Sequence, residues 1–350
     1  MKPQLLDCTL RDGSYANNFT FSKNDTSNLC KALQSIGIEF IEIGHGVGIS
    51  ASEKGFGKST EKDLIYMKAA SKVLNKSKWG MFCIPNIAEI DDVKEALDEG
   101  MGFIRIGVNP EDLKSAIPFI ELAKKRNIFT CVNFMKSYLK KPIEFANLAV
   151  LAENYGADLV YIVDSAGGML PEELDEYFIN IKEKSSTILL GFHGHNNLGL
   201  GVANSLKAIE YNANLIDVSL QGFGRGAGNT PSEQFVCALI RKGIDINIDP
   251  IKIMDISENY YELLLNNKAG IDSIDTISGL SLFHSSYMNI IQKYANKHQV
   301  DPRKLIINLC KLNNTDAPEN LVEDIAIKLR NNQEIGSWKD LYKHYFGKEQ

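Results

Sequence analysis

Two histidines, His193 and His195, are separated by a single glycine within an apolar segment of the chain. In an extended strand alternate side chains share a face, with backbones roughly 6.6 Å apart, so both imidazoles can converge on one cation. Asp12 offers a carboxylate to the same site. Two imidazoles and one carboxylate suit Mn²⁺, Fe²⁺, Co²⁺ or Zn²⁺, and the carboxylate favours the harder ions. The pattern predicts a divalent metal site at these three residues; the alternative is a pair of hydrogen-bonded core histidines.

Arg11 stands directly before Asp12. Its guanidinium is always charged and planar, so beside a metal it could stabilise the negative charge that develops on an enolate oxygen. The alternative is a simple ion pair with a neighbouring carboxylate. His45 ends another apolar segment, and we expect it behind the metal ligands or in the wall of the cavity.

The segments that must position these residues are of two alternating kinds. Eight are apolar and of strand length, and they cover residues 4–10, 40–46, 80–85, 103–108, 129–135, 159–165, 188–195 and 215–224. The stretches between them repeat apolar residues with a helical period, as at Leu29, Leu33 and Ile36 and at Leu148, Leu151 and Ala152. Eight such units with nearly continuous apolar strands predict an α/β fold, a closed parallel (β/α)8 TIM barrel. An open doubly wound sheet is the alternative.

The barrel prediction also places the chemistry. In these barrels catalytic groups lie where a strand ends and the following loop begins. The polar clusters of this chain stand at those points, and the last of them is the glycine-rich turn 222–229. That turn lacks the spacing of a nucleotide-binding P-loop. It could bind phosphate, or its glycines could only permit a tight bend.

The alternation ends after about residue 265, where the stretches 282–297, 302–312 and 320–329 all have a helical pattern. We therefore predict a TIM-barrel catalytic domain over residues 1–265 and a helical C-terminal domain over residues 266–350. The second unit should pack on the barrel.

Composition excludes some classes of function. The net charge of the 350-residue chain is −6 and it has no basic tract, which argues against a nucleic-acid partner. The sequence shows no secretory leader and no apolar run long enough to span a membrane. The six cysteines are scattered without a CxxC pair, which is typical of reduced thiols. We expect a cytoplasmic protein that does not bind membranes.

Several motifs resemble a known family. Cys8-Thr-Leu-Arg-Asp-Gly13 together with the two histidines is similar to the metal-dependent lyases and synthases that include hydroxymethylglutaryl-CoA lyase, isopropylmalate synthase and homocitrate synthase. The closer resemblance is to the 4-hydroxy-2-oxovalerate aldolases. It rests on Glu42-Ile-Gly-His-Gly46 with Gly55-Phe-Gly57, Val163-Asp-Ser165, Gly194-His-Asn-Asn197, Leu200-Gly-Val-Ala-Asn204, Gly224-Arg-Gly-Ala-Gly-Asn229, Ser285-Ser286 and residues 322–326. The resemblance covers nearly the whole chain.

This resemblance implies cleavage of a 4-hydroxy-2-oxo acid to pyruvate and an aldehyde. It implies that Asp12, His193 and His195 hold the metal, usually Mn²⁺, with Mg²⁺, Co²⁺ or Zn²⁺ as alternatives. Arg11 would stabilise the pyruvate enolate, and Ser165 would contact the pyruvyl group. From the glycine-rich turn, Arg225 and Asn229 are expected to bind substrate. A homodimer is expected, and an acylating aldehyde dehydrogenase is the partner that the family implies; the C-terminal unit is where either would bind.

The sequence departs from the family pattern at positions that matter. The family has a histidine two residues after Arg-Asp-Gly, where this chain has Tyr15, and a tyrosine before the Ser-Ser pair, where this chain has His284. We predict that Tyr15 and His284 form a proton-transfer pair with exchanged positions, in which His284 is the base. The alternative is that Tyr15 only packs and His284 only caps a helix. Arg225 and Asn86 also differ from the family, and they predict a polar or anionic aldehyde. The alternative is that Arg225 points to solvent or pairs with a loop carboxylate.

Three other readings stay open. A Claisen-type acyl-CoA synthase of the same superfamily would share the metal site. A Schiff-base aldolase would use Lys136, which follows the fifth apolar segment and would otherwise be solvated. A barrel that serves as a non-catalytic partner subunit would need neither the metal site nor a reactive lysine.

Overall fold

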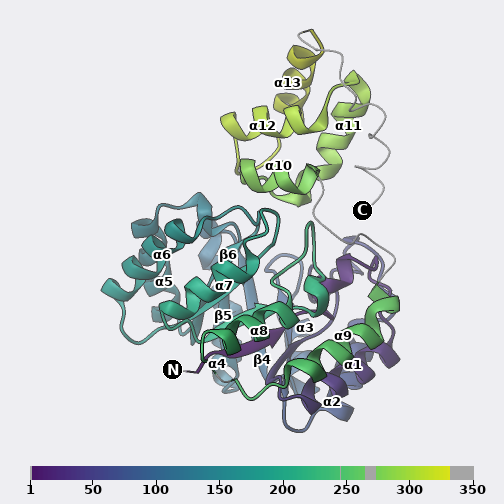
Figure 1. The fold of residues 1–350 in the computed structure, drawn as a ribbon, viewed down its shortest axis with the longest axis vertical. Coiled ribbons are helices and arrows are strands. Elements are labelled where there is room, and N and C mark those ends of the chain that lie inside the picture. The colour runs from purple at the N-terminus through teal and green to yellow at the C-terminus, as the bar shows by residue number, and fades with distance from the viewer. Residues whose placement is uncertain (1, 245, 265–272, 332–350) are drawn as a thin grey trace.

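The computed structural model describes residues 2–244, 246–264 and 273–331. Eight strands form one closed parallel barrel in which each strand pairs with the next and β8 returns to β1 (Figure 1). The strands are β1 (Gln4–Asp7), β2 (Phe40–Glu42), β3 (Lys78–Cys83), β4 (Phe103–Val108), β5 (Phe129–Phe134), β6 (Leu159–Asp164), β7 (Leu189–Gly194) and β8 (Leu215–Val218). All eight lie within or next to the predicted apolar segments, and the TIM barrel is confirmed.

A helix follows each strand and covers the outside of the barrel. These helices are α1 (Lys23–Ser35), α2 (Asp63–Val73), α3 (Ile90–Asp98), α4 (Ile117–Lys125), α5 (Pro142–Asn154), α6 (Pro171–Lys184), α7 (Gly201–Glu210) and α8 (Ser232–Arg241), with α9 (Pro250–Leu264) after them. Helix α1 begins with a capping box between Ser22 and Asp25 and buries Leu29 and Leu33 as predicted.

The predicted apolar face of α5 is confirmed at Ala152, which is buried, and at Leu148, which packs against the core, but it is wrong at Leu151. The helix buries Phe145, Ala149 and Ala152, whereas Leu151 is 36% exposed. The buried residues follow one another at intervals of four and three, so they define a helical stripe of their own. Leu148 and Leu151 also satisfy the helical period, but they lie on the flank of that stripe. Period alone does not decide which of two adjacent stripes faces the barrel.

A second group of helices follows the barrel: α10 (Ser273–Ser281), α11 (Met288–His298), α12 (Pro302–Leu312) and α13 (Glu319–Asn331). They pack around an apolar core of their own, which includes Phe283, Ile291, Leu305, Leu309 and Val322. Figure 1 shows them gathered beyond one end of the barrel. The predicted domain boundary at 265/266 lies outside the described residues and stays a prediction.

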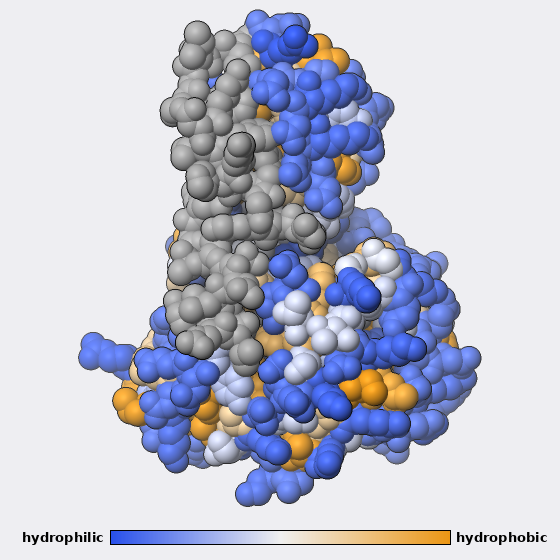
Figure 2. All heavy atoms as spheres, turned by 90° about the vertical axis from the view of Figure 1, so that its right-hand side faces the viewer, coloured by the Kyte–Doolittle hydropathy of each residue, from blue (hydrophilic) through white to orange (hydrophobic). Residues whose placement is uncertain are grey.

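The surface carries few grouped apolar side chains. On the face that Figure 2 shows, most coloured atoms are hydrophilic and the hydrophobic side chains form small scattered groups. Among the described helices, none combines the length and hydropathy that crossing a bilayer requires. All six cysteines, among them Cys8 and Cys131, are free thiols.

Candidate active site

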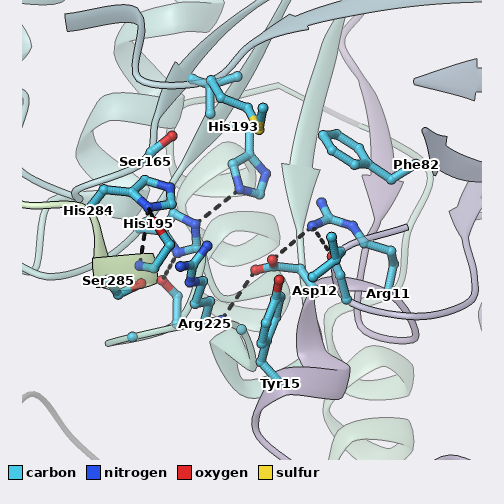
Figure 3. A pocket seen from close by; sticks show the side chains of 18 of the residues that line it. Arg11, Asp12, Tyr15, Phe82, Ser165, His193, His195, Arg225, His284 and Ser285 are labelled. Carbon is cyan, nitrogen blue, oxygen red and sulfur yellow. Dashed lines mark hydrogen bonds and ion pairs between the residues drawn. The ribbon is translucent and has the colours of Figure 1, made fainter. Parts of the chain in front are cut away.

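A cavity of about 800 Å³ lies at the end of the barrel where the strands terminate (Figure 3). Its wall combines side chains of the strand ends and their loops with side chains from residues 274–289 of the C-terminal helical unit. Eight predicted site residues line it: Arg11, Asp12, Tyr15, Ser165, His193, His195, Arg225 and His284. Residues from both ends of the sequence therefore share one cavity.

Asp12, His193 and His195 each present a ligand atom toward the others, and these atoms all lie within 4.8 Å of one another. His193 belongs to β7, and His195 follows directly after that strand. Asp12 does not end a strand, because β1 stops at Asp7 and Asp12 opens the short 3-10 helix η1 (Asp12–Tyr15). All three side chains are buried.

Hydrogen bonds determine which nitrogens of the two imidazoles face each other. Nδ1 of His193 lies 2.7 Å from Oδ2 of Asp217, and Nδ1 of His195 lies 3.2 Å from the carbonyl oxygen of Gly228. Both partners are acceptors, so each neutral ring carries its proton on Nδ1 and leaves a lone pair on Nε2. The two Nε2 atoms are 3.4 Å apart, where two lone pairs repel unless a cation binds both. The donor set therefore fits a divalent cation.

The protonation states agree with this fit. Burial alone would raise the pKa of the Asp12 carboxyl, but the charge of Arg11 and a hydrogen bond from Asn229 hold it well below its usual value. Burial lowers the pKa of His195 to about 4. An ionised carboxylate and a neutral imidazole are the forms that bind metals. Gly224 makes room for the carboxylate, since a Cβ at that position would lie 2.7 Å from Oδ2 of Asp12.

Three buried charged residues behind the ligands were missed from the sequence. Oε2 of Glu42 accepts hydrogen bonds from Nε of Arg11 and from Arg105, each at 2.7 Å. Arg105 also pairs with Asp217, which holds His193. A continuous chain of ion pairs and hydrogen bonds thus runs from Asp12 through Arg11, across the barrel interior, to His193.

A signal for these residues exists in the sequence. Glu42, Arg105 and Asp217 are charged residues inside segments that are otherwise apolar and of strand length. A charge in such a strand is expected to be paired, because an isolated buried charge is costly. The sequence does not say which charges meet, since they come from β2, β4 and β8.

Three predictions about individual residues differ from what the structure shows. Asn229 does not line the cavity; it is buried, and its Nδ2 donates to Oδ2 of Asp12 at 2.7 Å. His45 supports the loop after β2 instead of the cavity wall, since Nε2 lies 3.0 Å from the carbonyl oxygen of Gly57 and Nδ1 accepts from Val47 N–H. Asn86 is exposed and outside the cavity wall, in a turn with a φ of 74°.

Tyr15 and His284 line the same cavity on different sides of the metal-site residues (Figure 3). Between the described residues no direct hydrogen bond joins the two side chains. His284 is the N-cap of a 3-10 helix, and its Nδ1 accepts from Ser286 N–H at 3.2 Å. The neutral ring therefore carries its proton on Nε2. Burial and the charges of Arg225 and Lys136 place the pKa of His284 well below its usual value.

Lys136 is not solvated, in contrast to the expected alternative to a Schiff base. Only 7% of it is exposed, and it lines the cavity. Its Nζ lies 2.9 Å from the hydroxyl oxygen of Tyr287 and 3.4 Å from the carbonyl oxygen of Thr315. Both oxygens accept from Nζ, so these contacts occupy the nitrogen that a Schiff base would need.

A second set of possible ligand atoms, from Cys8, His193 and Asp217, overlaps the first. It fits a metal less well. The thiol of Cys8 donates to the carbonyl oxygen of Val218 at 3.3 Å, and burial raises its pKa well above the usual value. Asp217 is already paired with Arg105. A protonated thiol and a carboxylate that is already paired are poor metal ligands.

The fold and this donor set define a TIM-barrel enzyme with a divalent-metal site at the C-terminal ends of its strands. The HMGL-like family model matches residues 2–259. The 4-hydroxy-2-oxovalerate aldolase of Geobacillus genomosp. 3 is 34% identical over 326 residues, which cover 93% of this chain and 96% of the relative. That of Carboxydothermus hydrogenoformans is 33% identical over 94% of this chain and 97% of the relative. The chain belongs to the HMGL-like family and, within it, to the 4-hydroxy-2-oxovalerate aldolase family, whose members are carbon–carbon lyases.

Solved structures agree with the fold. The N-terminal domain of a protein assigned as an aldolase from Bacteroides vulgatus superposes with a TM-score of 0.68 at 25% identity, over 84% of this chain and 98% of that domain. The carboxyl transferase domain of Rhizobium etli pyruvate carboxylase gives a TM-score of 0.76 at 16% identity, over 95% of this chain and 61% of that chain. The second likeness shows a shared fold alone.

Proposed function

We propose that the chain cleaves a 4-hydroxy-2-oxo acid into pyruvate and an aldehyde, with Asp12, His193 and His195 as metal ligands and Mn²⁺ as the preferred ion. The observation that carries this proposal is the pair of facing Nε2 atoms at 3.4 Å beside the Asp12 carboxylate. When bound there, a divalent ion supplies Lewis-acid polarisation of the 2-oxo group. The names of the relatives support the reaction.

Arg11 would stabilise the charge that forms when the C3–C4 bond breaks. Its Nη1 donates to Oδ1 of Asp12 at 2.8 Å, so the guanidinium stays beside the metal site. Because Glu42 holds the other side of the group, the charge needs no reorganisation when an enolate oxygen develops. The hydroxyl oxygen of Ser165 accepts from the backbone N–H of Lys136 at 2.9 Å. The hydroxyl proton of Ser165 is therefore left to donate to the pyruvyl carboxylate.

The 4-hydroxyl proton needs a base. A neutral imidazole is a better base than a phenol, whose pKa is about 10. We therefore assign His284 as the base that accepts this proton and Tyr15 as the residue that orients the 4-hydroxyl. In the structure Nδ1 of His284 accepts from Ser286 N–H. The role therefore requires that His284 release this contact when substrate binds.

The test begins with metal content. About one divalent ion per chain is expected after reconstitution, measured by mass spectrometry. Pyruvate release is then followed from a panel of 4-hydroxy-2-oxo acids. We expect release that EDTA stops and Mn²⁺ restores better than Mg²⁺, Co²⁺ or Zn²⁺. Release that resists EDTA, with borohydride trapping at Lys136, would support a Schiff-base enzyme instead. No release from any acid would favour a non-catalytic subunit.

We also propose a homodimer, with helices α10–α13 as the contact for the second copy or for an acylating aldehyde dehydrogenase. Leu280 and Leu312 support this part, since 65% and 68% of these apolar side chains are exposed on that unit. Sedimentation of wild type and of a Leu280→Ser, Leu312→Ser double variant tests it. A wild-type monomer would contradict the dimer.

A further inference from the structure

We propose that Arg225 and Lys136 form an anion-binding subsite in the cavity, which holds a phosphate or carboxylate group on the aldehyde half of the substrate. The inference rests on the proposed function, since the aldehyde half is defined by aldol cleavage. It refines the expectation of a polar aldehyde, because Asn86 lies outside the cavity wall and Lys136 lies within it.

Lys136 is a buried side chain with no counter-ion among the described residues. It stands two residues after the end of β5, and only 7% of it is exposed. Its Nζ contacts two neutral oxygens, those of Tyr287 and Thr315. Among the described residues, no carboxylate lies within ion-pair distance of it. A buried ammonium of this kind is costly unless an anion joins it, and a substrate group in the cavity could be that anion.

Arg225 is the second cation of the cavity wall without a carboxylate partner among the described residues. It belongs to the glycine-rich turn after β8, and its guanidinium carbon lies 5.3 Å from the centroid of the Tyr15 ring. Stacking on an aromatic ring holds a guanidinium flat while its N–H groups stay free to bind a carboxylate or phosphate through two bonds. In Figure 3 it lies between Tyr15 and the side of the cavity that holds His284.

The two cations act on the same region. After burial, the charges of Arg225 and of Lys136 are the next largest influences on His284, and both lower its pKa. Tyr287, which binds Lys136, has its ring centroid 6.0 Å from that of His284. Two positive charges thus flank one wall of the cavity. Asp275 also lines the cavity, but its side chain lies beyond ion-pair distance of both cations.

The volume of the cavity agrees with an acceptor larger than a simple two-carbon aldehyde. About 800 Å³ is near the upper end of the range of roughly 300–1,000 Å³ that holds drug-sized ligands. The pyruvate half would bind at the metal ligands and Arg11. The part of the cavity wall beyond them, which includes Lys136, Arg225 and His284, is left for the aldehyde half.

The first test compares matched acceptors in the condensation direction with the metal-loaded enzyme and pyruvate. Glyceraldehyde 3-phosphate is compared with glyceraldehyde, and succinic semialdehyde with butanal. We expect kcat/KM to favour at least one anionic acceptor over its neutral match by about tenfold to a hundredfold, the ratio that a hydrogen bond to a charged group produces. The phosphate and carboxylate arms tell which anion is preferred. Equal values within both pairs would overturn the inference.

Variants then locate the subsite. We expect Arg225→Ala and Lys136→Met each to bring the anionic-to-neutral ratio to within threefold of one, and Arg225→Lys to restore part of it. The control is Arg126→Ala, which removes the same charge at the end of α4 that precedes β5; its ratio should equal that of wild type. A preference that survives in both Arg225→Ala and Lys136→Met would overturn the assignment.

A binding measurement separates this inference from the proposed function. Glycerol 3-phosphate and glycerol are titrated into the metal-loaded protein by calorimetry, which needs no turnover. Binding of the phosphate compound alone, weakened at least tenfold in Arg225→Ala, supports the subsite even if no aldol reaction is found. Turnover with neutral aldehydes, without any anionic preference or binding, would overturn the subsite and leave the aldolase intact.

Discussion

Glu42 and Arg11 form a buried ion pair in which Oε2 of Glu42 lies 2.7 Å from Nε of Arg11. The same oxygen accepts from Arg105, so it lies between two guanidinium groups. Arg11 is therefore fixed before any substrate arrives. Fixed charge at the point where charge develops is the arrangement that lowers a transition state most effectively.

The first prediction follows from this position. Arg11→Ala should lower kcat by roughly 10²–10³, the usual loss of a charge-stabilising donor, while about one metal ion per chain is retained. Arg11→Lys should recover little, because an ammonium cannot replace the two directed bonds to Asp12 and Glu42. Turnover of pyruvate formation and metal content are measured on the same samples. Near-normal turnover in the Ala variant would reject the role of Arg11.

The second prediction concerns the support of the metal ligands. Asp217→Asn should weaken metal binding by about tenfold to a hundredfold, because Oδ2 of Asp217 accepts from Nδ1 of His193 and so orients Nε2 toward the cation. Competition with a chromophoric chelator measures the affinity. Asp158→Asn is the matched control, since Asp158 pairs with Lys124 before β6. Unchanged affinity in Asp217→Asn would show that His193 needs no such partner.

The third prediction tests His284 as the base. His284→Ala should lower kcat for cleavage by roughly 10²–10⁴. In wild type the rate should fall on the acidic side at a pH below the usual imidazole value, because burial and two nearby cations lower the pKa of His284 and a base acts only when neutral. Tyr15→Phe should keep this acidic limb. Full cleavage by His284→Ala with the same acidic limb would show that Tyr15 or a water molecule, and not His284, accepts the proton.

The fourth prediction concerns stability. Burial raises the pKa of Asp7 from 3.8 to about 7, although two hydrogen bonds from Thr9 oppose this. The folded state therefore binds this proton more tightly than the unfolded chain. That contribution to stability is complete below pH 4 and is lost as the pH rises through 7. Asp7→Asn can keep both contacts with Thr9 and does not ionise.

The free energy of unfolding of Asp7→Asn, relative to that of wild type, should therefore increase between pH 4 and pH 7 and then stay constant. The limit is about 4 kcal/mol, from about 1.36 kcal/mol per pKa unit. Urea denaturation of both proteins at pH 5 and pH 8 checks it. Asp91→Asn, on the exposed surface of α3, should show no such trend. A difference that shrinks with pH would contradict the prediction.

The sequence by itself determined the barrel, because strand length and helical period are local properties that each segment carries alone. It also predicted which ends of the segments would bear polar side chains. It could not tell Leu151 from Ala149 as the buried residue of α5, since both satisfy a helical period. It also placed Asn229 with the substrate, although its amide reaches Asp12.

Only the tertiary structure decided which charges meet. Glu42, Arg105 and Asp217 stand on β2, β4 and β8, and their order in the chain does not reveal that they form one chain of contacts from Arg11 to His193. Closure of the sheet turns these alternating side chains into one narrow interior, where each charge must find an opposite partner because water is absent. The same closure brings Lys136 and Arg225, which are 89 positions apart, to one cavity wall.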